Sequence, residues 1–162
     1  MNMDSWTFEL RTRDPAREKT LEGLFTQANG YLGVRGYTEE GFPGRQRIPR
    51  NYAEDSRTMP HQYVAGVFDR SPVTGNTMGN LPTLRLTDIT LAGERLDLAA
   101  GSLADFSRGL GLRNGVAHRA FVWTSPAGRR TALRFESFVS WSRRHLLATR
   151  LEIRPLDWSG EV

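Results

Sequence analysis

The second half of the chain alternates apolar and polar residues over stretches of strand length. In residues 131–141, the apolar side chains of one face are Leu133, Phe135, Val139 and Trp141. Residues 147–153 alternate again, residues 116–124 form a further predicted strand, and short turns such as 125–128 separate these stretches. A period of two is typical of a strand with one buried face. Consecutive strands at this spacing predict an all-β chain, an antiparallel β-sandwich.

A glycine-rich stretch, residues 22–41, dominates the first half of the chain. It contains the pair Asn29-Gly30, which favours a tight type I′ turn because both central residues of such a turn have positive φ. Glycines recur at Gly30, Gly33 and Gly36, a spacing that matches neither a dinucleotide-binding fingerprint nor a phosphate-binding loop. Repeated glycines let another backbone come close. We therefore predict a twisted β-hairpin against which another segment packs tightly.

The other elements are assigned from shorter patterns. Residues 14–19 predict a turn or a single helical turn, because the aspartate Asp14 is a good cap and the proline Pro15 fits the first helical position. No stretch shows sustained helical periodicity. The remaining predicted elements are a strand at 6–10, the apolar block Leu24-Phe25 in the first arm of the hairpin, a loop at 40–60, a buried strand at 61–69, a second loop at 70–82, a strand pair within 84–98, and an irregular strand or short helix at 101–115.

Composition is that of a globular chain with one domain. Of its 162 residues, 38% are hydrophobic and 25% are charged. Cysteine is absent, which excludes disulfides, thiolate metal sites and a cysteine nucleophile. No apolar run is long enough to cross a bilayer and there is no signal-peptide core, so we predict a cytoplasmic protein without membrane contacts. The net charge of +4 comes from arginines spread through the chain, which argues against nucleic-acid binding.

The ionisable residues form no catalytic constellation. Glycoside cleavage needs a carboxylic acid beside the leaving oxygen, and a base, a nucleophile or phosphate on the other side. Glu39, Glu40 and Asp69 are not brought together by any pattern, and we interpret them as surface or loop-capping charges. The histidines, which lack metal-ligand spacing, are His61, His118 and His145. We therefore predict no catalytic, cofactor-binding or metal-binding residue in this chain.

The aromatic residues of the second half allow two interpretations. They can form the sandwich core, where aromatic area dominates burial, or an exposed platform on which a sugar ring stacks. The core is the favoured interpretation, and the platform stays open. The residues concerned are Trp123, Phe135, Phe138, Trp141 and Trp158.

Blocks along nearly the whole chain carry a family resemblance. The first comprises Glu22, Leu24-Phe25 and residues 29–36, Asn-Gly-Tyr-Leu-Gly-Val-Arg-Gly. The later blocks are 63–69, 80–82, 96–98 with Gly101, positions between Arg113 and Arg129, 138–140, 144–146, Arg150 with Glu152, and 155–160. In this order they resemble the N-terminal domain of glycoside hydrolase family 65, which contains the maltose, trehalose and kojibiose phosphorylases. Gly23 and Ala28 depart from its usual pattern without removing a catalytic group.

The resemblance implies a mutarotase-like β-sandwich, or supersandwich, over residues 1–162, incomplete at its C-terminal end. In the family this domain precedes a linker and a catalytic (α/α)6 barrel, which holds the single acid glutamate and the phosphate site. The implied reaction is phosphorolysis, or in some members hydrolysis, of an α-glucosyl disaccharide such as maltose, trehalose or kojibiose, with inversion. Inorganic phosphate is the co-substrate and no cofactor is implied. This chain alone is expected to be inactive.

The resemblance also implies partners. They are the catalytic domain of the same protein, the disaccharide bound there, and a second copy in a full-length homodimer. The predicted domain-interface residues are Asn29, Gly30, Tyr31, Gly33, Arg35, Gly36 and Asp69. The alternative is a free-standing carbohydrate-binding β-sandwich module. The preference for arginine over lysine is typical of a GC-rich bacterial genome.

Overall fold

The computed structural model describes residues 2–4, 6–40, 61–72 and 75–162. A 3-10 turn, η1 (Pro15–Arg17), leads into the helix α1 (Glu18–Leu24). The other elements of this part of the chain are the strands β1 (Asn2–Asp4), β2 (Thr7–Leu10), β3 (Gln27–Ala28), β4 (Leu32–Val34), β5 (Gln62–Val64), β6 (Phe68–Ser71), β7 (Gly75–Met78), β8 (Thr90–Leu91), β9 (Glu94–Arg95), β10 (Ser102–Gly111), β11 (Ala117–Thr124), β12 (Arg130–Val139) and β13 (Leu147–Pro155).

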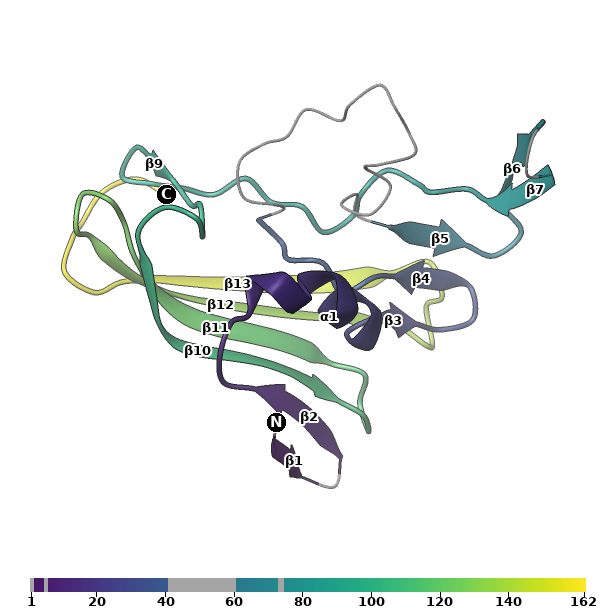
Figure 1. Ribbon diagram of the computed structural model, residues 1–162, viewed down its shortest axis with the longest axis horizontal. Coiled ribbons are helices and arrows are strands. Elements are labelled where there is room, and N and C mark those ends of the chain that lie inside the picture. Colours follow the sequence, from purple (N-terminus) through teal and green to yellow (C-terminus); the bar gives the residue numbers. More distant parts are fainter. Residues whose placement is uncertain (1, 5, 41–60, 73–74) are drawn as a thin grey trace.

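A six-stranded antiparallel sheet, in the order β1-β2-β10-β11-β12-β13, forms one layer of the molecule (Figure 1). Its four longest strands are consecutive in sequence and form a meander. In β11 and β12 every second residue is buried, because successive side chains of a strand point to opposite faces. The register places Leu133 opposite Phe121 on one side and Ile153 on the other, so the apolar residues share one face. The predicted antiparallel β-sandwich class is confirmed.

Shorter elements cover the inner face of this sheet. The three-stranded sheet β3-β4-β5 lies over one end, and the two-stranded sheet β8-β9 lies at the other (Figure 1). Each end has its own hydrophobic cluster. The first comprises Ile89, Leu91, Leu96, Leu98, Phe121, Trp123, Leu133 and Phe135. The second comprises Leu32, Val34, Tyr37 and Val139. The core is therefore divided along the length of the sheet.

The outer face of the six-stranded sheet carries a row of polar residues. The register lines up Glu9, Gly109, His118, Glu136 and Arg150 in one row across five strands. Burial lowers the pKa of His118, and the positive charge of Arg134 lowers that pKa further. Hydrogen bonds from the same arginine lower the pKa of Glu136. This face thus carries ion pairs, while the opposite face carries the core.

The predicted hairpin is confirmed, but its turn differs from the prediction. Gln27 pairs with Val34, and the N–H of Asn29 donates to the carbonyl of Leu32 at 3.1 Å. The central residues of the turn are therefore Gly30 and Tyr31. Gly30 has a φ of 82°, whereas Tyr31 is not among the described residues with positive φ. The type I′ turn is wrong, because that type needs positive φ at both central positions.

Two other predictions of the first half are wrong. The block Leu24-Phe25 does not lie in a hairpin arm, because Leu24 ends α1 and the chain then turns into β3. The expected buried strand at 61–69 is divided into β5 and β6 by a turn at Gly66 (φ 83°), and Phe68 is exposed. The helical turn is confirmed: the Asp14 side chain accepts from the N–H of Ala16 at 3.0 Å. Residues 41–60 of the expected loop lie outside the described residues.

The stretch 101–115, predicted as either an irregular strand or a short helix, contains a strand. It forms β10, which pairs with β2 on one side and β11 on the other. Its register shifts between Ala104 and Ser107, and Asp105 in this bulge has a φ of 53°. A bulge inserts an extra residue and disturbs the alternation of the strand. This irregularity explains why the sequence pattern alone did not separate a strand from a helix.

Candidate domain interface

Asn29, one of the predicted interface residues, is fixed inside the fold. It is 3% exposed. Its Nδ2 donates to the carbonyl oxygens of Ser140 at 2.6 Å and Arg144 at 3.0 Å. Its Oδ1 accepts from the N–H groups of Tyr31 at 3.0 Å and Leu32 at 2.8 Å. Asn29 therefore joins the β3–β4 turn to the β12–β13 turn of its own chain.

Gly30 and Tyr31 are the accessible residues of the same turn. A Cβ at Gly30 would meet no atom within 4 Å. The Tyr31 ring is half-buried and stands edge-on to the ring of His145, with 4.5 Å between the ring centroids. These two residues leave a small surface that a second domain can contact.

The close backbone approach expected of the glycines occurs at Gly36. Its N–H donates to the carbonyl of Glu22 at 2.9 Å, and an added Cβ would overlap both the side chain and the carbonyl group of Phe25. Gly33 has more space, since its nearest neighbour would be 4.0 Å away. Arg35 is partly exposed, and its Nε lies 3.7 Å from a carboxylate oxygen of Glu22. The approach at Gly36 is thus made by another segment of the same chain.

Asp69 lies apart from the other predicted interface residues. It sits on β6 opposite Thr77 of β7, in a hairpin that extends from one end of the molecule (Figure 1). The next pair of this hairpin is Phe68 and Met78, and both side chains are exposed. The structure therefore does not gather the predicted interface residues into one surface.

A cluster of buried charges contacts both hydrophobic clusters, because Arg85 faces the Tyr37 ring and Arg119 faces the Phe135 ring. We call Glu39, Glu40, Arg85, Arg108 and Arg119 the buried charge cluster. Arg119 donates to Glu40 at 2.7 Å and to Glu39 at 2.9 Å, and Arg85 forms an ion pair with Glu39. Arg108 donates to a backbone carbonyl and to Glu18 of α1 at 3.2 Å. The charges join the segment before residue 41 to the inner face of the sheet.

The charged states of this cluster support one another. Burial by itself raises the pKa of Glu39, but Arg119 and Arg85 outweigh burial and lower that pKa below its usual value. Burial likewise disfavours the charged form of Arg119, yet Glu40 and Glu39 raise its pKa. For Arg108 burial prevails and lowers the pKa. The Arg119 guanidinium also faces the Phe135 ring, 4.7 Å from its centroid.

The interpretation of Glu39 and Glu40 as surface charges is wrong. Glu39 is 7% exposed, and the exposed fraction of the Glu40 side chain is also 7%. One sequence signal could have found their partner. Arg119 shares the inner face of β11 with Ala117 and Phe121, and an arginine at a core-facing position requires a buried counter-charge.

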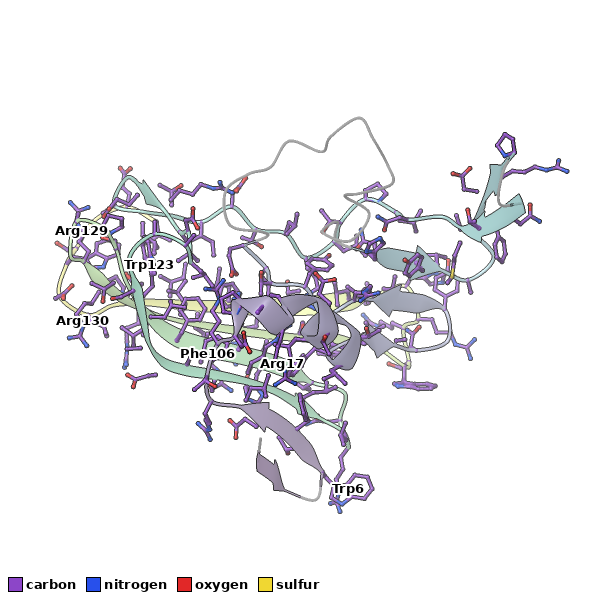
Figure 2. All side chains as sticks on the ribbon, in the orientation of Figure 1. Trp6, Arg17, Phe106, Trp123, Arg129 and Arg130 are labelled. Carbon is purple, nitrogen blue, oxygen red and sulfur yellow. The ribbon has the colours of Figure 1, made fainter. Side chains whose placement is uncertain are left out.

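The aromatic residues are divided between core and surface. Trp123 is 1% exposed and Phe135 is 3% exposed, and Figure 2 shows Trp123 inside the fold near the turn that carries Arg129 and Arg130. The indole of Trp158 packs partly against the same core and donates to Thr131 at 2.9 Å. Phe138 and Trp141 are exposed, with fractions of 42% and 75%. Of the five aromatic residues considered for a sugar-stacking platform, Phe138 and Trp141 are thus the ones that are exposed.

The residues that the structure describes contain no group of three or more His, Asp or Glu side chains placed to hold a metal ion. The described helices include none that is long and apolar enough to span a membrane.

The geometry defines an antiparallel β domain of two layers, in which the buried charge cluster pairs a covering segment with the inner face of the sheet. The family model of the glycosyl hydrolase family 65 N-terminal domain matches residues 10–162. The chain belongs to this family.

Similar proteins include kojibiose phosphorylase of Halothermothrix orenii, 36% identical over 88% of this chain and 16% of that protein. Alpha,alpha-trehalose phosphorylase of Thermoanaerobacter brockii is 28% identical over 87% of this chain and 18% of that protein. The chain thus spans less than a fifth of the length of these relatives. A solved structure, a putative kojibiose phosphorylase from human microbiome, has a TM-score of 0.78 at 19% identity, and the match covers 95% of this chain and 20% of that chain. That likeness supports the fold.

Proposed function

We propose that this chain is the non-catalytic N-terminal domain of an enzyme that phosphorolyses an α-glucosyl disaccharide with inversion. The observation that carries the proposal is the match to family 65 over residues 10–162, together with the 16% share of a kojibiose phosphorylase that the chain covers. Kojibiose, trehalose and maltose are the candidate substrates. Inorganic phosphate is the co-substrate, no cofactor takes part, and the full-length enzyme is a bacterial, cytoplasmic homodimer.

The chemistry of the buried charge cluster supports a structural, non-catalytic role for this domain. A glycosidase acid needs a carboxylic acid that is protonated beside the leaving oxygen. Glu39 has a lowered pKa and is held by Arg119 and Arg85, so it is a carboxylate at neutral pH. Glu40 accepts hydrogen bonds from the same Arg119. Neither group is free to act on a sugar, which supports the proposal that the acid lies in the catalytic domain of the longer protein.

Activity assays test the proposal. The full-length protein is incubated with phosphate and kojibiose, trehalose or maltose, and the release of β-glucose 1-phosphate is measured. We expect release with one of these disaccharides from the full-length protein, and none from the 162-residue chain. Release by the 162-residue chain alone, or none of the three accepted by the full-length protein, would refute the proposal.

A carbohydrate-binding module is the second candidate, favoured by the 75% exposure of Trp141. Trp141 has hydroxyl neighbours at Ser140 and Ser142 and cationic neighbours at Arg143 and Arg144. Sugars bind by stacking on an aromatic face with polar groups around it. Calorimetry against a panel of α-glucosides would show saturable binding that Trp141→Ala abolishes. Absence of heat across the panel would remove this candidate.

A further inference from the structure

The β6–β7 hairpin carries an exposed apolar pair. Phe68 stands directly opposite Met78, and their side chains are 64% and 56% exposed. Val67, next to Phe68, is also exposed. In Figure 1 the hairpin extends from the end of the molecule that is farther from the C-terminus.

The described part of the chain gives this hairpin little support. It forms a two-stranded sheet of its own, and neither of the two described core clusters contains one of its residues. At its base, Val67 donates to Val64 at 3.1 Å and accepts from Gly79 at 3.3 Å. A two-stranded hairpin by itself is marginally stable at best in water. An exposed apolar pair on such a hairpin is therefore typical of a surface that a partner covers.

The two faces of the hairpin differ in chemistry. Side chains alternate between faces, so Phe68 and Met78 share one face with Arg70, while Asp69 and Thr77 lie on the other. A surface that fits the first face is apolar where it meets Phe68. It presents an acidic or carbonyl group near Arg70. The polar face stays in water.

We propose that the Phe68–Met78 face of this hairpin docks on the remainder of the full-length polypeptide, which is the catalytic domain in the proposed function on which this inference rests. Most of the length of the kojibiose phosphorylase of Halothermothrix orenii lies outside the 16% that this chain covers. A second copy of this chain is a poorer occupant, because each copy carries a net charge of +4 and like charges repel.

Thiol labelling in the full-length protein tests the docking. Met78→Cys is labelled with N-ethylmaleimide in the native state and in urea, and peptide mass spectrometry assigns the label to position 78. A covered thiol reacts slowly, since reaction needs access. We expect native labelling at least about tenfold slower than labelling in urea. Phe68→Ser in the same variant removes the apolar partner and should return the native rate to nearly the urea rate.

The matched control is Leu112→Cys, because Leu112 is 58% exposed and lies outside the hairpin. Its native rate should approach its rate in urea. Fast native labelling of position 78 overturns the proposal, and so does slow labelling that Phe68→Ser leaves unchanged. Slow labelling that disappears on dilution assigns the surface to a second copy and also overturns the proposal.

Release of glucose 1-phosphate by the unsubstituted full-length protein is measured separately. Docking without activity contradicts only the proposed function, and activity without docking contradicts only this inference.

Discussion

The meander β10–β13 and the segments that cover it differ in strand length and in the polar side chains that they bury. Three strands of the meander have nine or ten residues and the fourth has eight, whereas the covering strands β3, β4, β5, β8 and β9 have two or three. The two central strands of the meander, β11 and β12, alternate buried and outward-facing residues. The covering segments bury polar side chains beside their apolar ones, among them Gln27, Asn29, Gln62 and Arg85.

Gln62 shows how a buried polar side chain of a covering segment bonds to neighbouring backbone groups. Its side chain is fully buried. It donates to the carbonyl of Leu81 at 3.0 Å and accepts from the N–H of Leu84 at 2.8 Å. A buried amide must be paired, because an unpaired one costs free energy. The short covering strands thus combine apolar burial with side-chain hydrogen bonds to neighbouring backbone groups.

The first prediction removes the charge on β11 that pairs with carboxylates of the covering region. Arg119→Met leaves Glu39 and Glu40 buried without their main partner. We expect the free energy of unfolding in urea to fall by about 3–5 kcal/mol, because breaking a buried pair leaves an uncompensated charge. The control is Arg134→Met, which breaks an ion pair with Glu136 on the outer face and should cost less than about 1 kcal/mol. Equal effects of the two substitutions on the free energy of unfolding would contradict the placement of Arg119 in buried ion pairs.

The second prediction tests apolar burial in the meander. Phe135→Ala should lower the free energy of unfolding by about 3–5 kcal/mol, because it removes a ring from the core and leaves a cavity. Phe138 is the internal control, since it lies on the same strand but faces outward and is 42% exposed. Phe138→Ala should cost about 1 kcal/mol or less. If the two substitutions cost the same in urea unfolding, the assignment of the faces is wrong.

A third prediction concerns the link between the two regions. Asn29→Ala removes the hydrogen bonds to the β12–β13 turn and leaves the carbonyls of Ser140 and Arg144 without this donor. We expect a loss of about 1–3 kcal/mol, together with faster amide hydrogen exchange in the β3–β4 turn. Unchanged exchange in that turn would show that the link is not made.

The smallest expected effect is an acid-dependent loss of stability. Glu39 has a pKa below its ordinary value of 4.5 in the folded chain, so the folded state favours its charged form. Its contribution to stability is present above about pH 4.5 and is lost as the pH falls below that value. One carboxylate supplies a slope of at most about 1.4 kcal/mol per pH unit. Urea unfolding from pH 5 to pH 3 should show a smaller slope in Glu39→Gln, and an identical slope would argue against this origin.

The sequence predicted the meander because its signal is local. Leu133, Phe135 and Val139 alternate with polar residues, and the register then follows from short turns. The covering region depends on contacts between distant residues, such as Arg119 with Glu39, and no short pattern contains them. The start of β6 was predicted as part of a buried strand, because Val67 and Phe68 are apolar although both are exposed. The rest of the β6–β7 hairpin was predicted as a loop, and that prediction is wrong. Of the interface candidates, Asn29 and Gly36 are engaged within the chain, and the relation of the others to a partner stays a prediction.

The most direct test of the central claim is to sequence the source DNA beyond the codon for Val162. We expect the reading frame to continue through further strand patterns into a long helical region with a candidate acid glutamate, as a family 65 phosphorylase requires. A stop codon directly after Val162 would contradict the assignment of this chain to a larger enzyme, and would make sugar binding at Trp141 the function to test.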